Sequence, residues 1–159
     1  MEAHRGDAGS DSTTPQEQYD LAAAFPSLGI AHTEFHDHEQ AMVALQASVD
    51  ILRRMIRERD NIGKTKQLLE AIEMTLASER QTKRALGDWD ELLQQPANVL
   101  PDLLLIRGKE LMKRGQLQAA AQAAEKLSTL DADDEAPLYD AACIFSLSAA
   151  PVNAKDGLG

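Results

Sequence analysis

The chain has few of the residues that cross-link or stiffen small proteins. Its 159 residues include one cysteine, Cys143, so no disulfide can close within the chain, and we expect a reducing, cytoplasmic location. Aromatic residues make up only 4% of the sequence, and glycine (9) and proline (6) are scarce. Stretches that alternate strictly between apolar and polar residues are also hard to find. This composition favours an all-α fold of closely packed helices.

Long hydrophobic runs are missing as well. A membrane helix needs about 20 consecutive apolar residues, and no run in this sequence approaches that length. Residues 1–18 are polar and have no apolar centre, so they are not a signal peptide, and we expect a disordered tail there. A second disordered tail is expected at residues 151–159. A membrane partner is therefore not predicted.

The charge balance is acidic. There are 26 acidic and 16 basic residues, which gives a formal net charge of −10. A negative surface repels the phosphates of nucleic acids, so nucleic acid is not an expected partner. The charge is most simply explained by solubility.

Between the expected tails, apolar residues follow a helical period. Asp37 is a suitable N-cap, and the helix after it carries Ala41 and Leu45 on one face. Pro26 falls inside the first helical stretch, where it should kink the helix or mark its first turn. We expect helices at about residues 18–35, 38–60, 64–86, 88–95, 101–114, 116–130 and 136–149.

Small and large residues recur at fixed spacing in the second half of the chain. With Pro101 as position 1, Leu104 stands at position 4, Gly108 at 8, Leu111 at 11 and Ala120 at 20. Small residues at positions 8 and 20 let two helices of a hairpin approach closely, and the large residues fill the gaps between neighbours. The spacing therefore predicts helical hairpins packed side by side.

The same spacing recurs one unit of about 34 residues later, at Leu138, Ala142 and Phe145. Near the start, Gly29 and Ala41 take positions 8 and 20. The pattern resembles tetratricopeptide (TPR) repeats, which implies a short solenoid of antiparallel hairpins spanning residues 19–150. Its units would be residues 22–55, an irregular 56–100, 101–134 and a half-unit at 135–150. The alternative is a generic helical bundle, which requires no fixed period.

A narrower resemblance appears in the second half. Residues 86–89 (Leu-Gly-Asp-Trp) and 138–143 (Leu-Tyr-Asp-Ala-Ala-Cys) look like the C-terminal repeat region of large bacterial serine/threonine protein kinases. The kinase catalytic motifs are absent from the sequence, including the glycine-rich phosphate loop, His-Arg-Asp and Asp-Phe-Gly. We therefore expect no enzymatic activity, no catalytic residues and no cofactor. The resemblance implies an alternative function, as a non-catalytic remnant or regulatory piece of such a kinase.

Three histidines cluster in one short string, His32, His36 and His38, with Glu34 between the first two. Two histidines four positions apart on a helix can hold zinc. However, the string spans the turn expected before Asp37, and its glutamate is not where zinc proteases place theirs. The sequence favours a packed His32 and two solvated turn histidines. No metal site is predicted, and a histidine metal hydrolase is a distant alternative.

The favoured function is a scaffold that binds a peptide or partner domain on a helical-repeat surface. In such arrays the first helix of each hairpin lines the binding surface. The residues at those places, predicted to contact the partner, are Ile30, Thr33, Glu34, Leu105, Lys109, Met112 and Lys113.

The last expected helix has no second helix to cover it. Its apolar residues are spread around its axis, Ile144 and Phe145 among them, so we expect an exposed apolar strip. This strip predicts self-association through the C-terminal helix, weakened by glutamate at either position. The alternatives are a partner that covers the strip or a natural polypeptide that continues further.

Overall fold

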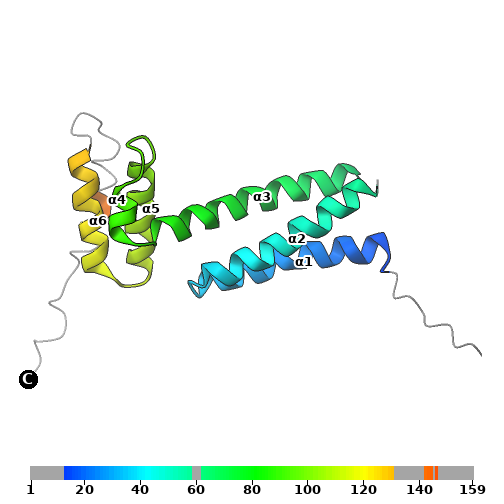
Figure 1. Ribbon diagram of the computed structural model, residues 1–159. Helices are drawn as coiled ribbons and strands as arrows, with labels where there is room; N and C mark the ends of the chain where they lie inside the picture. The colour runs from blue at the N-terminus through cyan, green and yellow to red at the C-terminus, as the bar shows by residue number, and fades with distance from the viewer. Residues whose placement is uncertain (1–12, 59–61, 131–141, 145, 147–159) are drawn as a thin grey trace, which may run out of the picture.

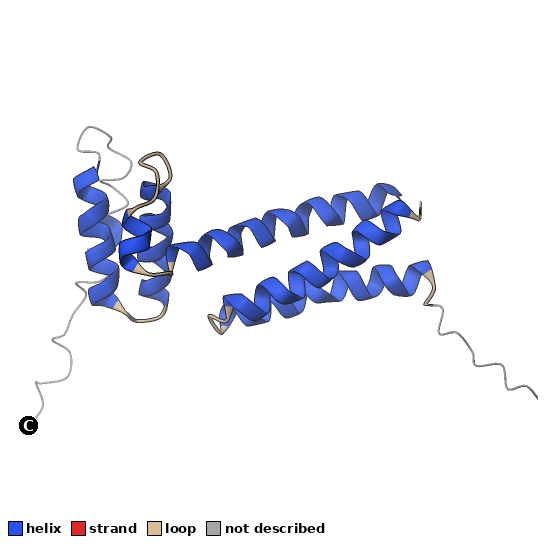
Figure 2. Ribbon diagram, in the orientation of Figure 1, coloured by secondary structure: helices blue, strands red, loops and turns tan. Residues whose placement is uncertain are grey.

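The computed structural model describes residues 13–58, 62–130, 142–144 and 146. Every regular element in this part of the chain is helical, which confirms the all-α prediction (Figure 2). The helices are α1 (Pro15–Glu34), α2 (His38–Arg57), α3 (Ile62–Ala85), α4 (Trp89–Leu93), α5 (Leu100–Lys113) and α6 (Leu117–Leu130). Residues 142–144 and 146 are helical too. Within these ranges, no helix has the length and hydropathy needed to cross a membrane.

Helix α1 begins earlier than the sequence pattern predicts. The Thr14 side chain accepts a hydrogen bond from the backbone N–H of Glu17, and the Glu17 carboxylate accepts one from the backbone N–H of Thr14. This reciprocal pair is a capping box, and Pro15 follows at the first helical position. The predicted tail at residues 1–18 is therefore wrong for its last four residues. Residues 1–12 and 147–159 lie outside the described part of the chain.

The first three helices form one layer in which α2 lies between α1 and α3 (Figure 1). The predicted N-cap of α2 is confirmed, because the Asp37 carboxylate accepts a hydrogen bond from the backbone N–H of Gln40 at 3.1 Å. The predicted apolar face of α2 is buried as well. The core of this layer consists of Ala22, Leu45, Val49, Leu52, Met55, Ile72 and Leu76.

Helix α3 extends beyond this layer and joins it to the group formed by α4, α5 and α6 (Figure 1). Near its middle it contributes Ile72 and Leu76 to the first core, and at its end Ala85 belongs to the second core. Arg107 of α5 fixes this junction, since one guanidinium nitrogen donates hydrogen bonds to the carbonyls of Ala85 (2.7 Å) and Gly87 (2.8 Å). The two helical groups therefore share one continuous element.

Two glycines mark close approaches, and one of them differs from expectation. A Cβ at Gly29 would lie 3.1 Å from Cγ of Leu45, as expected where α1 and α2 pack tightly. A Cβ at Gly108 would lie 2.6 Å from Cδ1 of Ile144, so this glycine makes room for a residue that follows α6. Ile144 is only 1% exposed. The predicted exposed strip is therefore wrong at Ile144, and Phe145 lies outside the described residues.

Candidate functional site

Four ionisable side chains meet where the turn between α1 and α2 approaches α3 and α5. They are His36 in the turn, His38 at the start of α2, Glu79 on α3 and Glu110 on α5. His38, Glu79 and Glu110 are buried, and the side chain of His36 is about one third exposed. Charged groups are seldom buried unless they are paired or bind a metal. We call these four residues the His–Glu cluster.

Glu79 orients the ring of His38. One of its carboxylate oxygens, Oε2, lies 2.7 Å from Nδ1 of His38, and the other accepts a hydrogen bond from the Thr33 hydroxyl at 2.9 Å. A carboxylate can only accept hydrogen bonds at neutral pH, so Nδ1 of His38 must carry the hydrogen. This contact turns the other ring nitrogen, Nε2, toward Glu110.

Glu110 is the centre of the cluster. Its Oε1 lies 2.8 Å from Nδ1 of His36, 3.3 Å from Nε2 of His38 and 3.5 Å from Nε of Arg114, and its Oε2 lies 3.3 Å from Nζ of Lys113. Burial raises the pKa of Glu110, but hydrogen bonds from His36 and Lys113 and the charges of Lys113 and His38 outweigh burial. The pKa of Glu110 therefore lies below its ordinary value.

One polar atom of the cluster has no hydrogen bond. Nε2 of His38 is buried, and although Oε1 of Glu110 is 3.3 Å away, the two atoms do not meet hydrogen-bond geometry. Buried polar atoms without a partner are rare and costly. A surface pocket of about 400 Å³ lies beside the cluster, and His36, His38 and Arg114 are among its lining residues. The histidine side of the cluster therefore borders a pocket, whereas Glu79 and Glu110 do not line it.

The structure changes the interpretation of the three histidines. His32 stays apart on α1, with its Nδ1 3.9 Å from Oδ2 of Asp37. The prediction of two solvated turn histidines is wrong for His38, which is buried. No sequence signal pointed to Glu110, which follows His36 by 74 positions. Of the histidine string, the fold brings His36 and His38 together with two distant carboxylates.

The α1 residues predicted to bind a partner have unequal surroundings. Ile30 and Glu34 are exposed, whereas Thr33 is partly buried and bonded to Glu79. On α5, Leu105 and Met112 are partly buried and pack against the second core.

The two predicted lysines of α5 are exposed. Lys113 reaches Glu110 with a largely exposed side chain, and Lys109 also has an interaction within the chain. The α5 set therefore offers two lysines at the surface and no continuous apolar strip.

Large apolar side chains are exposed along α1 and at its C-terminal end. Leu21, Leu28 and Phe35 are 51%, 49% and 82% exposed. Leu21 and Leu28 lie on one face of α1, because residues spaced by seven share a helix face, and Phe35 is the C-cap residue just after the helix. The helix buries Ala22 and Gly29, and it lies at the edge of its layer against α2 (Figure 1). We call Leu21, Leu28 and Phe35 the α1 stripe.

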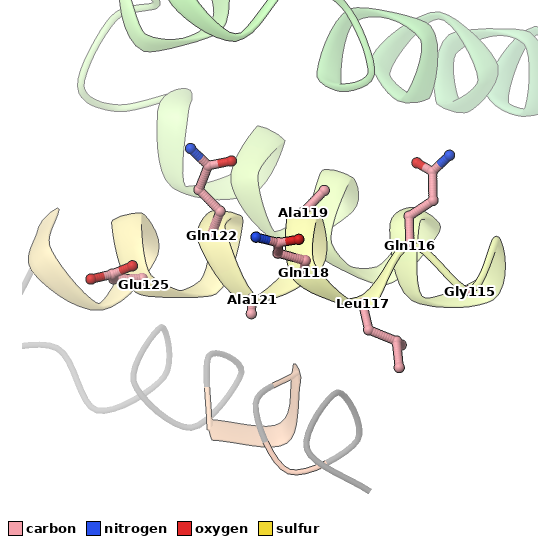
Figure 3. Close-up of a pocket in the computed structure, with 8 residues that line it drawn as sticks. All are labelled: Gly115, Gln116, Leu117, Gln118, Ala119, Ala121, Gln122 and Glu125. Atoms are coloured by element: carbon pink, nitrogen blue, oxygen red, sulfur yellow. The ribbon is translucent and has the colours of Figure 1, made fainter. Parts of the chain in front are cut away.

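A wide hollow of about 920 Å³ runs along α6 (Figure 3). Its lining consists of Gly115, Gln116, Leu117, Gln118, Ala119, Ala121, Gln122 and Glu125. Only Glu125 among these eight residues is ionisable, and none of them is a nucleophile. The hollow therefore offers weaker grounds for a site than the His–Glu cluster or the α1 stripe.

No family model, curated protein or solved structure matches this chain. The resemblances to tetratricopeptide repeats and to a kinase C-terminal region therefore stay predictions.

Proposed function

We propose that this chain is a non-catalytic helical scaffold that binds another protein, and that the α1 stripe is its docking surface. The observation that carries the proposal is the exposure of Leu21 and Leu28 on one face of an edge helix and of Phe35 at its C-cap. In many complexes the apolar face of an amphipathic helix from one protein packs against exposed apolar residues of the other. On small proteins, exposed apolar patches often mark the sites where other molecules bind.

The energy of covering the stripe limits what the partner must supply. Burying a whole leucine or phenylalanine side chain contributes about 1.5–3 kcal/mol. Because the three side chains are half to four-fifths exposed, covering them contributes roughly 4 kcal/mol in total. This only begins to offset the loss of translational and rotational freedom on association, estimated at about 4–15 kcal/mol. The partner must therefore make further contacts around the stripe.

The surroundings of the stripe suggest the chemistry of that partner. Glu17, Asp20 and Glu34 lie exposed on the same helix, and the whole chain carries a formal net charge of −10. Complementary charges at the rim of an interface favour encounter and fix orientation. We therefore expect an amphipathic helix with apolar residues at heptad spacing and basic residues beside them.

We further propose that the hairpins are tetratricopeptide-like and that the protein is cytoplasmic. Two sets of observations support the repeat. Gly29 faces Leu45 and Ala41 across the first hairpin, as positions 8 and 20 require. In the later unit, the residues at positions 4, 8, 11 and 20 are all buried; they are Leu104, Gly108, Leu111 and Ala120.

The proposal can be tested by quantitative capture of proteins from a native extract, using the wild-type chain, Leu28→Glu and a matched control, Met74→Glu. Met74 is 74% exposed and belongs to α3, a different helix from the stripe, so the control also replaces one exposed apolar side chain by glutamate. Leu28→Glu removes apolar burial and forces a charge into the interface, which should weaken capture at least about tenfold. Circular dichroism verifies that both variants fold. Capture of the same proteins in the same amounts by both variants would contradict the proposal.

A further inference from the structure

We propose that the His–Glu cluster binds a divalent transition metal ion, best Zn²⁺, through His36, His38 and Glu110. One possible ligand atom from each of these three residues lies within 4.8 Å of the others. The inference is independent of the α1 stripe and assigns the chain a second binding site. The ligands come from the α1–α2 turn, the start of α2 and α5, so the ion would tie the first helical layer to the second group.

The donor set suits zinc. Two imidazoles and one carboxylate form a common three-residue zinc site, in which water or another small ligand completes a tetrahedron. Calcium and magnesium prefer oxygen ligands, so the two histidines disfavour them. A pocket of about 400 Å³ is lined by His36 and His38 among other residues, so two of the three proposed ligands border open space.

Glu79 supplies the outer contact that metal-binding histidines usually have. A ligating histidine commonly donates its second ring N–H to a carboxylate, which fixes the ring and makes the ligating nitrogen more basic. Nδ1 of His38 makes this contact with Glu79 at 2.7 Å. The Thr33 hydroxyl holds the other oxygen of Glu79 at 2.9 Å. The ring of His38 is therefore held with Nε2 as the available ligand atom.

The unpartnered Nε2 of His38 is the second observation that points to an ion. His38 is only 7% exposed, and a neutral ring with its hydrogen on Nδ1 would present the lone pair of Nε2 to Oε1 of Glu110. Two acceptors then face each other at 3.3 Å, which a cation between them would relieve. In a tetrahedral site with zinc–ligand bonds of about 2.0–2.1 Å, two ligand atoms are about 3.3–3.4 Å apart. To ligate the ion, Nδ1 of His36 would give up the hydrogen that it donates to Glu110 here, so that the neutral ring carries its hydrogen on Nε2. The contact between His36 and Glu110 would also have to widen by about half an ångström.

A simpler arrangement competes with this one. If both histidines are protonated, the cluster is a buried ion-pair network in which Glu110 is also neutralised by Lys113 and Arg114. Such a network satisfies the same short contacts and gives no reason for metal binding. The ion-pair network does not explain why Nε2 of His38 lacks a hydrogen bond, whereas a metal ion bound to this atom would. Direct binding measurements separate the two.

The experiment uses the untagged full-length chain, stripped of metal, and Co²⁺ as the probe. We expect one Co²⁺ per chain with a visible absorption typical of tetrahedral coordination, and its displacement by one equivalent of Zn²⁺. His36→Gln and Glu110→Gln should bind Co²⁺ and Zn²⁺ at least about tenfold more weakly. Glu79→Gln, which alters only the outer contact, should weaken binding by about tenfold. His32→Gln is the matched control and should bind like the wild type.

Folding of each metal-free variant is checked by circular dichroism. Because His36 is partly exposed, His36→Gln tests the site even if Glu110→Gln fails to fold. The proposal is overturned if the wild type binds neither ion at about 100 μM, because structural zinc sites bind with apparent free energies of about 10–16 kcal/mol and are filled far below that concentration. It is also overturned if His36→Gln binds as tightly as the wild type, or if His32→Gln loses the ion.

Discussion

Replacing Glu110 by glutamine keeps the size of the side chain and removes its charge. In the folded chain this carboxylate is almost fully buried and lies within 3.5 Å of His36, His38, Lys113 and Arg114. The variant therefore removes the anion on which the cluster depends, and the surrounding backbone can stay as it is.

The cost follows from which partners are buried. Lys113 has a mostly exposed side chain, and exposed ion pairs contribute less than about 1 kcal/mol. The hydrogen bond from Nδ1 of His36 to Glu110 is mostly shielded from water, and a hydrogen bond to a charged group contributes about 1.5–3 kcal/mol. Glutamine keeps an acceptor oxygen for His36, but the bond is then between neutral groups and contributes about 0.5–1.5 kcal/mol. We expect Glu110→Gln to lower the free energy of unfolding at pH 7 by about 1–2 kcal/mol.

The effect should depend on pH in a definite direction. The pKa of Glu110 is lower in the folded chain than its ordinary value, which is about 4.3 in an unfolded chain. A group with a depressed pKa adds stability that is fully present above its unfolded pKa and is lost as the pH falls through its folded pKa. The stability difference between wild type and Glu110→Gln should therefore be complete at neutral pH and shrink below about pH 4.3.

Urea unfolding followed by circular dichroism in metal-free buffer measures both effects. The matched control is Glu39→Gln, because Glu39 is exposed and pairs with the exposed Lys83 at 3.2 Å. The control should change the free energy of unfolding by less than about 1 kcal/mol. The reasoning is refuted if Glu110→Gln costs no more than Glu39→Gln, or if the difference from wild type grows on acidification.

Two stability predictions concern the packing around α5, and urea midpoints test both. Gly108→Leu should destabilise by roughly 1–3 kcal/mol, because the new side chain overlaps buried Ile144. Gly115→Ala should cost less, about 1 kcal/mol, because Gly115 has open space but a φ of +71°; equal, small shifts would contradict this order. Arg107→Ala should cost about 2 kcal/mol, because it loses two carbonyl hydrogen bonds and the stacking of its guanidinium 5.2 Å from the Trp89 ring centroid. A cost below about 0.5 kcal/mol would show that Arg107 does not fix the junction.

The helices with strong local signals could be predicted from sequence. Helix α2 has both an N-cap at Asp37 and apolar residues at helical spacing. Both signals involve residues that are only one or two helical turns apart in sequence. The start of α1 differs from the predicted one because residues 13–18 are polar and show no apolar period, although Thr14 and Glu17 have the spacing of a capping box. A cap can start a helix where apolar periodicity gives no sign of one.

The His–Glu cluster could be predicted only in part. The histidine string marks one side of it, but Glu79 and Glu110 look like ordinary solvent-facing residues of helices. Their burial follows from packing between α2, α3 and α5, which brings together residues far apart in sequence. The burial of Ile144 could not be predicted either, because it depends on the space that Gly108 leaves by having no side chain.

The central claim, that a partner binds on the α1 stripe, is tested most directly by photo-crosslinking in a native extract. A photoreactive amino acid is placed at position 28 in one variant and at position 74 in another, since both wild-type side chains are exposed. We predict a discrete crosslinked adduct from position 28, which an excess of unlabelled wild-type chain suppresses, and none from position 74. An equal yield of adducts from both positions, or none from position 28, would contradict the account.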